Sequence, residues 1–166
     1  MTPGGPDATG LSAGVVVASN RAAAGVYDDT TGPLITDFLA ELGFVVGNPQ
    51  VVPDGDPVGE AISAFVSAGA RVVLTTGGTG LTPTDRTPEA TRPLLDREVP
   101  GIAEAIRAAG VAAGVPSAVL SRGVAGVVGD CLVVNLPGSR GGVKDGLAVL
   151  RPWLRHAVEQ IVGSDH

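Results

Sequence analysis

Cysteine, aromatic residues and clustered basic residues are all scarce in this 166-residue chain, and each shortage excludes a class of protein. Cys131 is the only cysteine, so no disulfide can form within the chain and no zinc site can be built from several thiolates. Aromatic residues make up 3% of the chain against 44% for hydrophobic residues, which favours an α/β core of Val, Ala, Leu and Ile. The 11 Lys and Arg residues are scattered and the net charge is −6, which argues against nucleic acid as a partner.

Long apolar runs are missing as well. No run approaches the roughly 20 residues of a membrane span, and no basic and apolar leader pattern is visible. Because a lone thiol suits a reducing compartment, we expect a cytoplasmic protein with no membrane partner. Cys131 lies in an apolar run and is interpreted as a buried hydrophobic residue rather than a nucleophile. Residues 1–10 are expected to form a disordered tail, followed by a single domain over residues 11–163.

The remaining sequence alternates between extended and helical patterns. Short apolar segments predict strands at residues 15–18, 44–46, 50–52 and 71–75. Helical spacing predicts helices at residues 33–42 and 57–66, one starting at Pro88 with Thr87 as its cap, one at 102–112 and one at 143–161. Residues 116–122 stay open between a loop and a short helix.

Two apolar runs, 123–128 and 131–136, flank Gly129-Asp130 and predict a hairpin. Together with the alternating order, this predicts an α/β fold in which a mostly parallel, mixed sheet carries helices on both faces. Ligands of such sheets bind where the parallel strands end. The polar loops 19–29, 53–56, 75–87 and 135–140 each follow a strand, so we expect them to meet at one edge.

One of these loops is rich in glycine and threonine: Thr75-Thr76-Gly77-Gly78-Thr79-Gly80, with Asp85 shortly after it. Glycines let a backbone approach a ligand closely, and free N–H groups can bind an anion. The loop lacks the lysine of a Walker motif and the spacing of a Rossmann fingerprint. We interpret it as a site for a phosphorylated ligand, with a purely structural glycine turn as the alternative.

Five segments in the right order resemble the MoaB/MogA family of molybdenum cofactor biosynthesis. These are the segment from Ser19-Asn20-Arg21 to Gly32, Val52-Pro53-Asp54, the glycine loop with Asp85-Arg86-Thr87-Pro88-Glu89-Ala90, Glu98-Val99-Pro100-Gly101, and Asn135-Leu136-Pro137-Gly138. The resemblance spans roughly residues 12–155. It implies a three-layer α/β/α molybdopterin-binding fold, a homotrimer or hexamer, and adenylylation of molybdopterin with ATP and Mg²⁺. It also implies a partner enzyme that later inserts molybdenum.

Two acidic residues match the family's important acids, Asp54 and Asp85, and are expected to be catalytic and to bind Mg²⁺. A carboxylate beside a phosphate is repulsive unless a cation lies between them, and Mg²⁺ favours a few carboxylates plus phosphate oxygens. Alternatives stay open for both. Asp85 could be a turn or capping acid, and Asp54 could belong to a Pro-Asp-Gly turn, with Asp56 as a competing ligand.

The resemblance places further residues around the substrates. Nucleotide or pterin contacts are expected from Ser19, Thr76, Gly77, Gly78, Thr79, Gly80, Asn135, Pro137, Gly138 and Ser139. Ser139 could equally cap a helix, and at least one of Asp28 and Asp29 is expected to do so. No role is assigned to either histidine.

Asn20 departs from the family, in which many members carry Asp after that serine. We expect it to stabilise the loop rather than to bind metal. A non-catalytic pterin carrier and, less favoured, a trimeric scaffold remain as alternatives to the enzyme.

Overall fold

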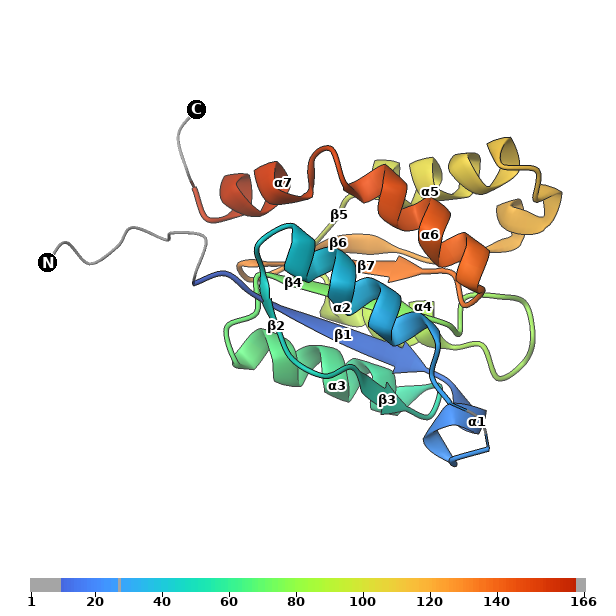
Figure 1. The fold of residues 1–166 in the computed structure, drawn as a ribbon. Coiled ribbons are helices and arrows are strands. Elements are labelled where there is room, and N and C mark those ends of the chain that lie inside the picture. The colour runs from blue at the N-terminus through green and yellow to red at the C-terminus, as the bar shows by residue number, and fades with distance from the viewer. Residues whose placement is uncertain (1–9, 27, 164–166) are drawn as a thin grey trace, which may run out of the picture.

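The computed structural model describes residues 10–26 and 28–163, and most of the predicted tail lies outside this range. The described strands form one sheet, in the order β2-β1-β4-β7-β6-β5, with β3 also paired to β1 (Figure 1). Their bounds are β1 (Ser12–Ala18), β2 (Val45–Val46), β3 (Gln50–Val52), β4 (Val72–Thr76), β5 (Arg97–Glu98), β6 (Ala125–Val128) and β7 (Cys131–Leu136).

The pairings of β1 with β2, β3 and β4, and of β4 with β7, are parallel, whereas β6 runs antiparallel to β7 and to β5. The predicted mixed, mostly parallel sheet is therefore confirmed. The hairpin is confirmed too, since Val128 pairs with Cys131 across Gly129-Asp130. The two-residue edge strand β5 carried no recognisable pattern in the sequence.

Helices cover both faces of this sheet. The α-helices are α1 (Asn20–Ala23), α2 (Thr31–Glu41), α3 (Asp56–Ser67), α4 (Thr87–Thr91), α5 (Pro100–Ala112), α6 (Arg140–Leu150) and α7 (Leu154–Ile161). Two 3-10 helices are η1 (Arg92–Leu94) and η2 (Pro116–Leu120), the second within the segment that the sequence left open. Helices α2, α5, α6 and α7 pack on one face, and α3 with the α4–η1 segment on the other.

Each face has its own apolar core because the central strands are buried on both sides. Val15, Val17 and Leu74 face the α2–α6 side, while Val16 and Val73 face α3. These side chains are at most 4% exposed. This double burial explains why the sequences of β1 and β4 contain continuous apolar runs. The end of each apolar run therefore lies at or near the end of its strand.

Two predictions about helices need correction. The single helix expected over residues 143–161 is broken into α6 and α7. Pro152 lies at the break, where its ring cannot continue the helical hydrogen bonding. Thr87 does not cap α4 from outside, because it is the first helical residue and Arg86 takes the cap position without a side-chain bond.

Candidate active site

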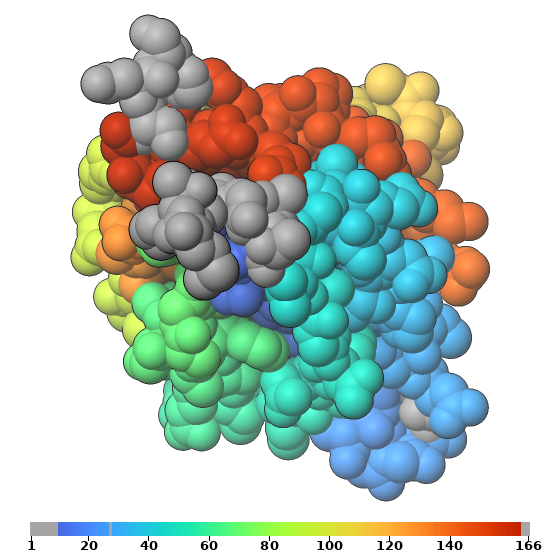
Figure 2. Space-filling model, turned by 60° about the vertical axis from the view of Figure 1, so that its left-hand side comes forward, coloured from blue at the N-terminus to red at the C-terminus, as the bar shows by residue number. Residues whose placement is uncertain are grey.

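Four loops meet at the carboxyl edge of the parallel strands, as predicted. Ser19 N–H donates to Val52 O at 3.0 Å, which joins the loops after β1 and β3. Thr76 Oγ1 donates to Pro137 O at 2.7 Å, which joins the ends of β4 and β7. The loop after β1 projects as a bulge at one corner of the molecule (Figure 2).

Glycines at the centre of this edge allow the loops to touch. Gly77 and Gly78 adopt φ values of +89° and +69°, which a residue with a side chain rarely takes. A Cβ on Gly77 would lie 2.3 Å from Ala18 O, and one on Gly138 would lie 3.2 Å from Gly77 Cα. Backbone therefore packs directly on backbone here, and part of the glycine pattern serves the fold itself.

Asp54 is tied to two other loops. Its Oδ1 accepts a hydrogen bond from Arg86 N–H at 3.0 Å, and its own N–H donates to Asn20 Oδ1 at 2.9 Å. Oδ2 lies against Gly78, 2.6 Å from the position that a Cβ would take. Asn20 thus stabilises the Asp54 loop, as the sequence predicted.

Asp85 lies on the far part of the same glycine loop. Its Oδ2 accepts from Thr82 N–H at 3.1 Å and from Thr82 Oγ1 at 2.8 Å, and it lies beside Gly80. This is the turn-stabilising role that the sequence left open. The half-buried carboxylate also lines a cavity. No hydrogen bond joins Asp85 to Asp54; each lies against a different glycine.

Two hollows adjoin the central glycines. The first has a volume of about 330 Å³ and lies between the glycine loop, α5, η2 and the start of α6. It is lined by Gly78, Thr79, Gly80, Asp85, Pro137, Gly138 and Ser139 among the predicted residues. The second, of about 200 Å³, is lined by Ser19, Thr76, Gly77 and Gly138 together with residues at the start of α2. Ten predicted residues thus border the hollows.

Asn135 does not border either hollow. Its side chain is 3% exposed and makes three bonds within the protein. Its Oδ1 accepts from Val124 N–H, and its Nδ2 donates to Thr75 Oγ1 at 2.9 Å and Thr91 Oγ1 at 3.1 Å. The structure therefore gives Asn135 a supporting position beneath the loops in place of the expected ligand wall.

Several hydroxyl and carboxylate groups cap helices. Ser19 accepts from Ala22 N–H in α1, and Ser139 accepts from Gly142 N–H in α6. Asp29 accepts from the N–H groups of Thr31 and Gly32 at the start of α2, whereas Asp28 is exposed. The capping alternative for Ser139 and for one of the two acids is therefore confirmed.

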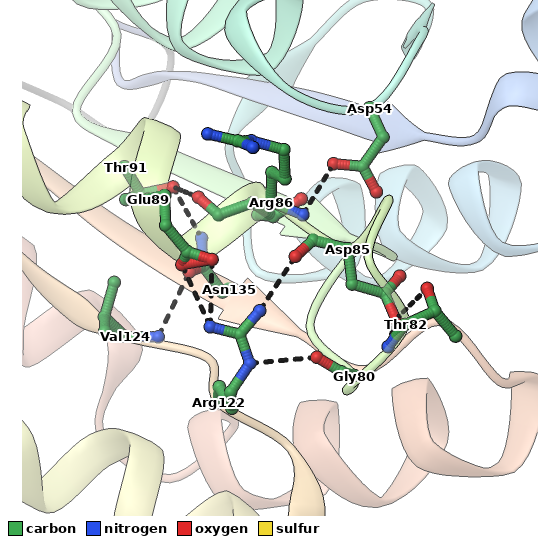
Figure 3. Close-up of polar contacts among 11 residues, drawn as sticks. Asp54, Gly80, Thr82, Asp85, Arg86, Glu89, Thr91, Arg122, Val124 and Asn135 are labelled. Carbon is green, nitrogen blue, oxygen red and sulfur yellow. Dashed lines mark hydrogen bonds and ion pairs between the residues drawn. The ribbon is translucent and has the colours of Figure 1, made fainter.

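Arg122 is a site residue that the sequence did not reveal. Its guanidinium donates to Gly80 O at 2.9 Å, to Asp85 O at 2.8 Å and to both carboxylate oxygens of Glu89 at 2.9 Å (Figure 3). Its main-chain N–H also donates to Thr79 O. Arg122 thus binds the loop after β4 at two places, at Thr79-Gly80 and at Asp85. It lies 37 residues from Asp85, and no local pattern signals such a contact.

Thr87 contrasts with Arg122, because within the described part of the chain its buried side chain lacks the hydrogen bonds that it could make. Its side chain is fully buried, at 0% exposure, and among the described residues its Oγ1 is the single buried side-chain nitrogen or oxygen that lacks a hydrogen-bond partner. Natural proteins rarely leave such groups unpaired. The hydroxyl lies beside Gly78 and Asp54, within the site.

Cys131 takes no part in this edge. It is 1% exposed, and burial raises the pKa of its thiol from 9.0 to about 12 despite the nearby Arg71. Because the thiolate is the nucleophile, this confirms the interpretation of a buried structural residue.

Known proteins share this fold. Residues 14–156 match the family model described as the probable molybdopterin binding domain. The chain belongs to this family. Its fold superposes on a solved structure of MogA with a TM-score of 0.88 at 57% identity, covering 90% of this chain and 99% of that one.

Curated members of the family are also similar over most of the chain. A molybdopterin adenylyltransferase of Pyrococcus furiosus is 37% identical over 152 residues, which are 88% of each protein. A molybdenum cofactor biosynthesis bifunctional protein of Synechococcus elongatus is 40% identical over 95% of this chain. The chain spans only about half of that longer protein, 49% of its length. No helix in the described part of the chain has the length and apolar character required to cross a bilayer.

Proposed function

We propose that this family member adenylylates molybdopterin. A terminal phosphate oxygen of molybdopterin attacks the α-phosphorus of ATP, the bond from that phosphorus to the bridging β-oxygen breaks, and pyrophosphate leaves. The observation that carries the proposal is the convergence of two carboxylates from different loops: Asp54, after β3, lies against Gly78, and Asp85 lies beside Gly80 on the glycine loop. Two hollows adjoin the same glycines, with Gly138 in the lining of both. The similarity to a molybdopterin adenylyltransferase over most of both chains supports it.

Positioning and charge neutralisation dominate the catalysis of phosphoryl and nucleotidyl transfer. Two hollows on either side of the central glycines offer one place for each substrate. The glycine loop would present main-chain N–H groups to the phosphates, and Ser139 at the start of α6 would border them. Arg122 would keep the loop in one conformation through its bonds to Gly80 O and Asp85 O.

The residues present fit a magnesium ion. Asp54 Oδ2 accepts no hydrogen bond from the described residues, and it lies so close to Gly78 that a side chain at that position would clash with it. Asp54 and Asp85 would hold the ion together with phosphate oxygens, a ligand set typical of Mg²⁺. When bound, the ion would neutralise the charge that gathers at the phosphorus and polarise its oxygens.

The family resemblance extends the proposal to assembly and cell location. We propose a homotrimer or hexamer in the cytoplasm, with a molybdenum-inserting enzyme as the consumer of the product. A single domain over residues 11–163 would suffice for the chemistry, because the hollows and both carboxylates lie within it.

The test combines the protein with molybdopterin, ATP and Mg²⁺, and follows pyrophosphate together with the mass of the pterin product. Release of pyrophosphate in step with a pterin heavier by one AMP supports the enzyme. Tight molybdopterin binding without either product would contradict it and would support the carrier alternative.

A further inference from the structure

The unpaired Thr87 hydroxyl lies where it can act on Asp54. Thr87 Oγ1 and Asp54 Oδ2 are 2.2 and 2.6 Å from the same point, the position that a Cβ of Gly78 would occupy. No side chain separates the two oxygens because residue 78 is glycine. Within residues 10–26 and 28–163, neither oxygen has a hydrogen-bond partner.

The backbone around this pair is fixed. Thr87 N–H donates to Gly78 O at 3.0 Å, and the preceding N–H, of Arg86, donates to Asp54 Oδ1 at 3.0 Å. One carboxylate oxygen of Asp54 is therefore anchored, while the other faces a buried hydroxyl across the glycine. A small rotation of the carboxylate about the anchored oxygen would bring Oδ2 toward Thr87.

A buried hydroxyl without a partner lowers stability, because its hydrogen bonds to water are lost and not replaced. Thr91, on the same short helix, shows the ordinary arrangement: its buried Oγ1 donates to Thr87 O at 2.7 Å and accepts from Asn135 Nδ2. The difference between these two threonines needs a reason, and loss of stability at functional sites is a familiar one.

We propose that Thr87 is a positioning residue whose hydroxyl donates a hydrogen bond to Asp54 Oδ2 when the site holds a divalent cation and nucleotide. Both Asp54 oxygens are then oriented, Oδ1 by Arg86 N–H and Oδ2 by Thr87, with a lone pair of Oδ2 left for the cation. The inference rests on the proposed function, since it takes Mg²⁺ and ATP as the occupants.

The experiment compares Thr87→Val, Thr87→Ser and the matched control Thr91→Val. Thermal unfolding is measured without ligand, and the Kd for ATP in the presence of Mg²⁺ is measured by calorimetry. Because Thr87→Val removes a hydroxyl that has no partner, we expect a melting temperature equal to or above that of the wild type. Thr91→Val removes a paired hydroxyl and should melt several degrees lower, on the order of 2–4 °C for each bond lost.

In the binding arm, Thr87→Val should weaken Mg²⁺-dependent ATP binding about tenfold or more, the usual effect of losing a hydrogen bond to a charged group. Thr87→Ser and Thr91→Val should bind as the wild type does. Unchanged binding by Thr87→Val, or a loss of stability matching that of Thr91→Val, would overturn the inference while leaving the proposed function intact. A wild-type protein that binds no ATP with Mg²⁺ would overturn the proposed function and the inference with it.

Discussion

Arg86 N–H donates to Asp54 Oδ1 at 3.0 Å, a bond between loops that lie 32 residues apart in the sequence. It holds the carboxylate after β3 against the glycine loop after β4. Asn20 supports the same position from the loop after β1, through its bond to Asp54 N–H. Three strand-end loops therefore converge on one acidic side chain.

The first prediction concerns this carboxylate and its companion. Asp54→Asn and Asp85→Asn should each lower the rate of AMP transfer by about 100-fold or more, because a neutral amide ligates Mg²⁺ poorly. Asp56→Asn is the matched control, since Asp56 is exposed in the first turn of α3. An Asp56→Asn variant as impaired as Asp54→Asn would show that the wrong acid of this loop has been chosen.

Gly78→Ala should damage both stability and activity. The φ of +69° is strained for alanine, and the new Cβ would lie 2.2 Å from Thr87 Oγ1 and 2.6 Å from Asp54 Oδ2. We expect a loss of about 2 kcal/mol or more in the free energy of unfolding, measured in urea. Gly47→Ala, where a Cβ would meet nothing within 4 Å, is the control and should unfold like the wild type.

Arg122→Lys should loosen the glycine loop. An ammonium group cannot reproduce the planar fork that reaches Gly80 O, Asp85 O and Glu89 together, so we expect faster amide hydrogen exchange over residues 79–86. The expected loss of stability is about 1–2 kcal/mol. Arg92→Lys, which alters one exposed ion pair with Glu98, should change neither quantity appreciably. Equal exchange in both variants would contradict the assigned role of Arg122.

Cys131 should react with a disulfide reagent at pH 8 only as fast as the protein unfolds. Its raised pKa of about 12 leaves about a thousandfold less thiolate than a thiol of pKa 9.0, and the side chain is buried. Because the folded pKa exceeds the unfolded one, this thiol's contribution to stability is complete below pH 9 and fades between pH 9 and about 12. Rapid modification of the native protein at pH 8 would contradict the burial.

The sheet edge was predictable because local patterns decide it. Apolar runs such as Val15–Ala18 and Val72–Leu74 mark buried parallel strands, and polar residues after them must then gather at one edge. The hairpin at Gly129-Asp130 was predictable for the same reason, because the turn and its two strands are adjacent in the sequence. Pro152 causes the break before α7. The apolar stripe over residues 143–161 keeps a helical spacing across this proline, and for that reason it predicted a single helix.

Contacts between distant loops were not predictable in the same way. Arg122 looks like any other arginine in the sequence, and its bonds to Gly80 and Asp85 exist only once the sheet has formed. Asn135 was assigned to the ligand wall because its motif was recognised, but the pleat of β7 turns its side chain inward onto Thr75 and Thr91. The side on which a residue emerges depends on strand register, which a motif does not specify.

The central claim is that the AMP moiety of ATP passes to molybdopterin at this edge. The most direct measurement uses ATP labelled at the α-phosphate, incubated with the protein, molybdopterin and Mg²⁺, followed by separation of the pterin. The account predicts that α-label enters the pterin with one pyrophosphate released per transfer, and that γ-label does not. Pterin that stays unlabelled while the protein holds both substrates would contradict it.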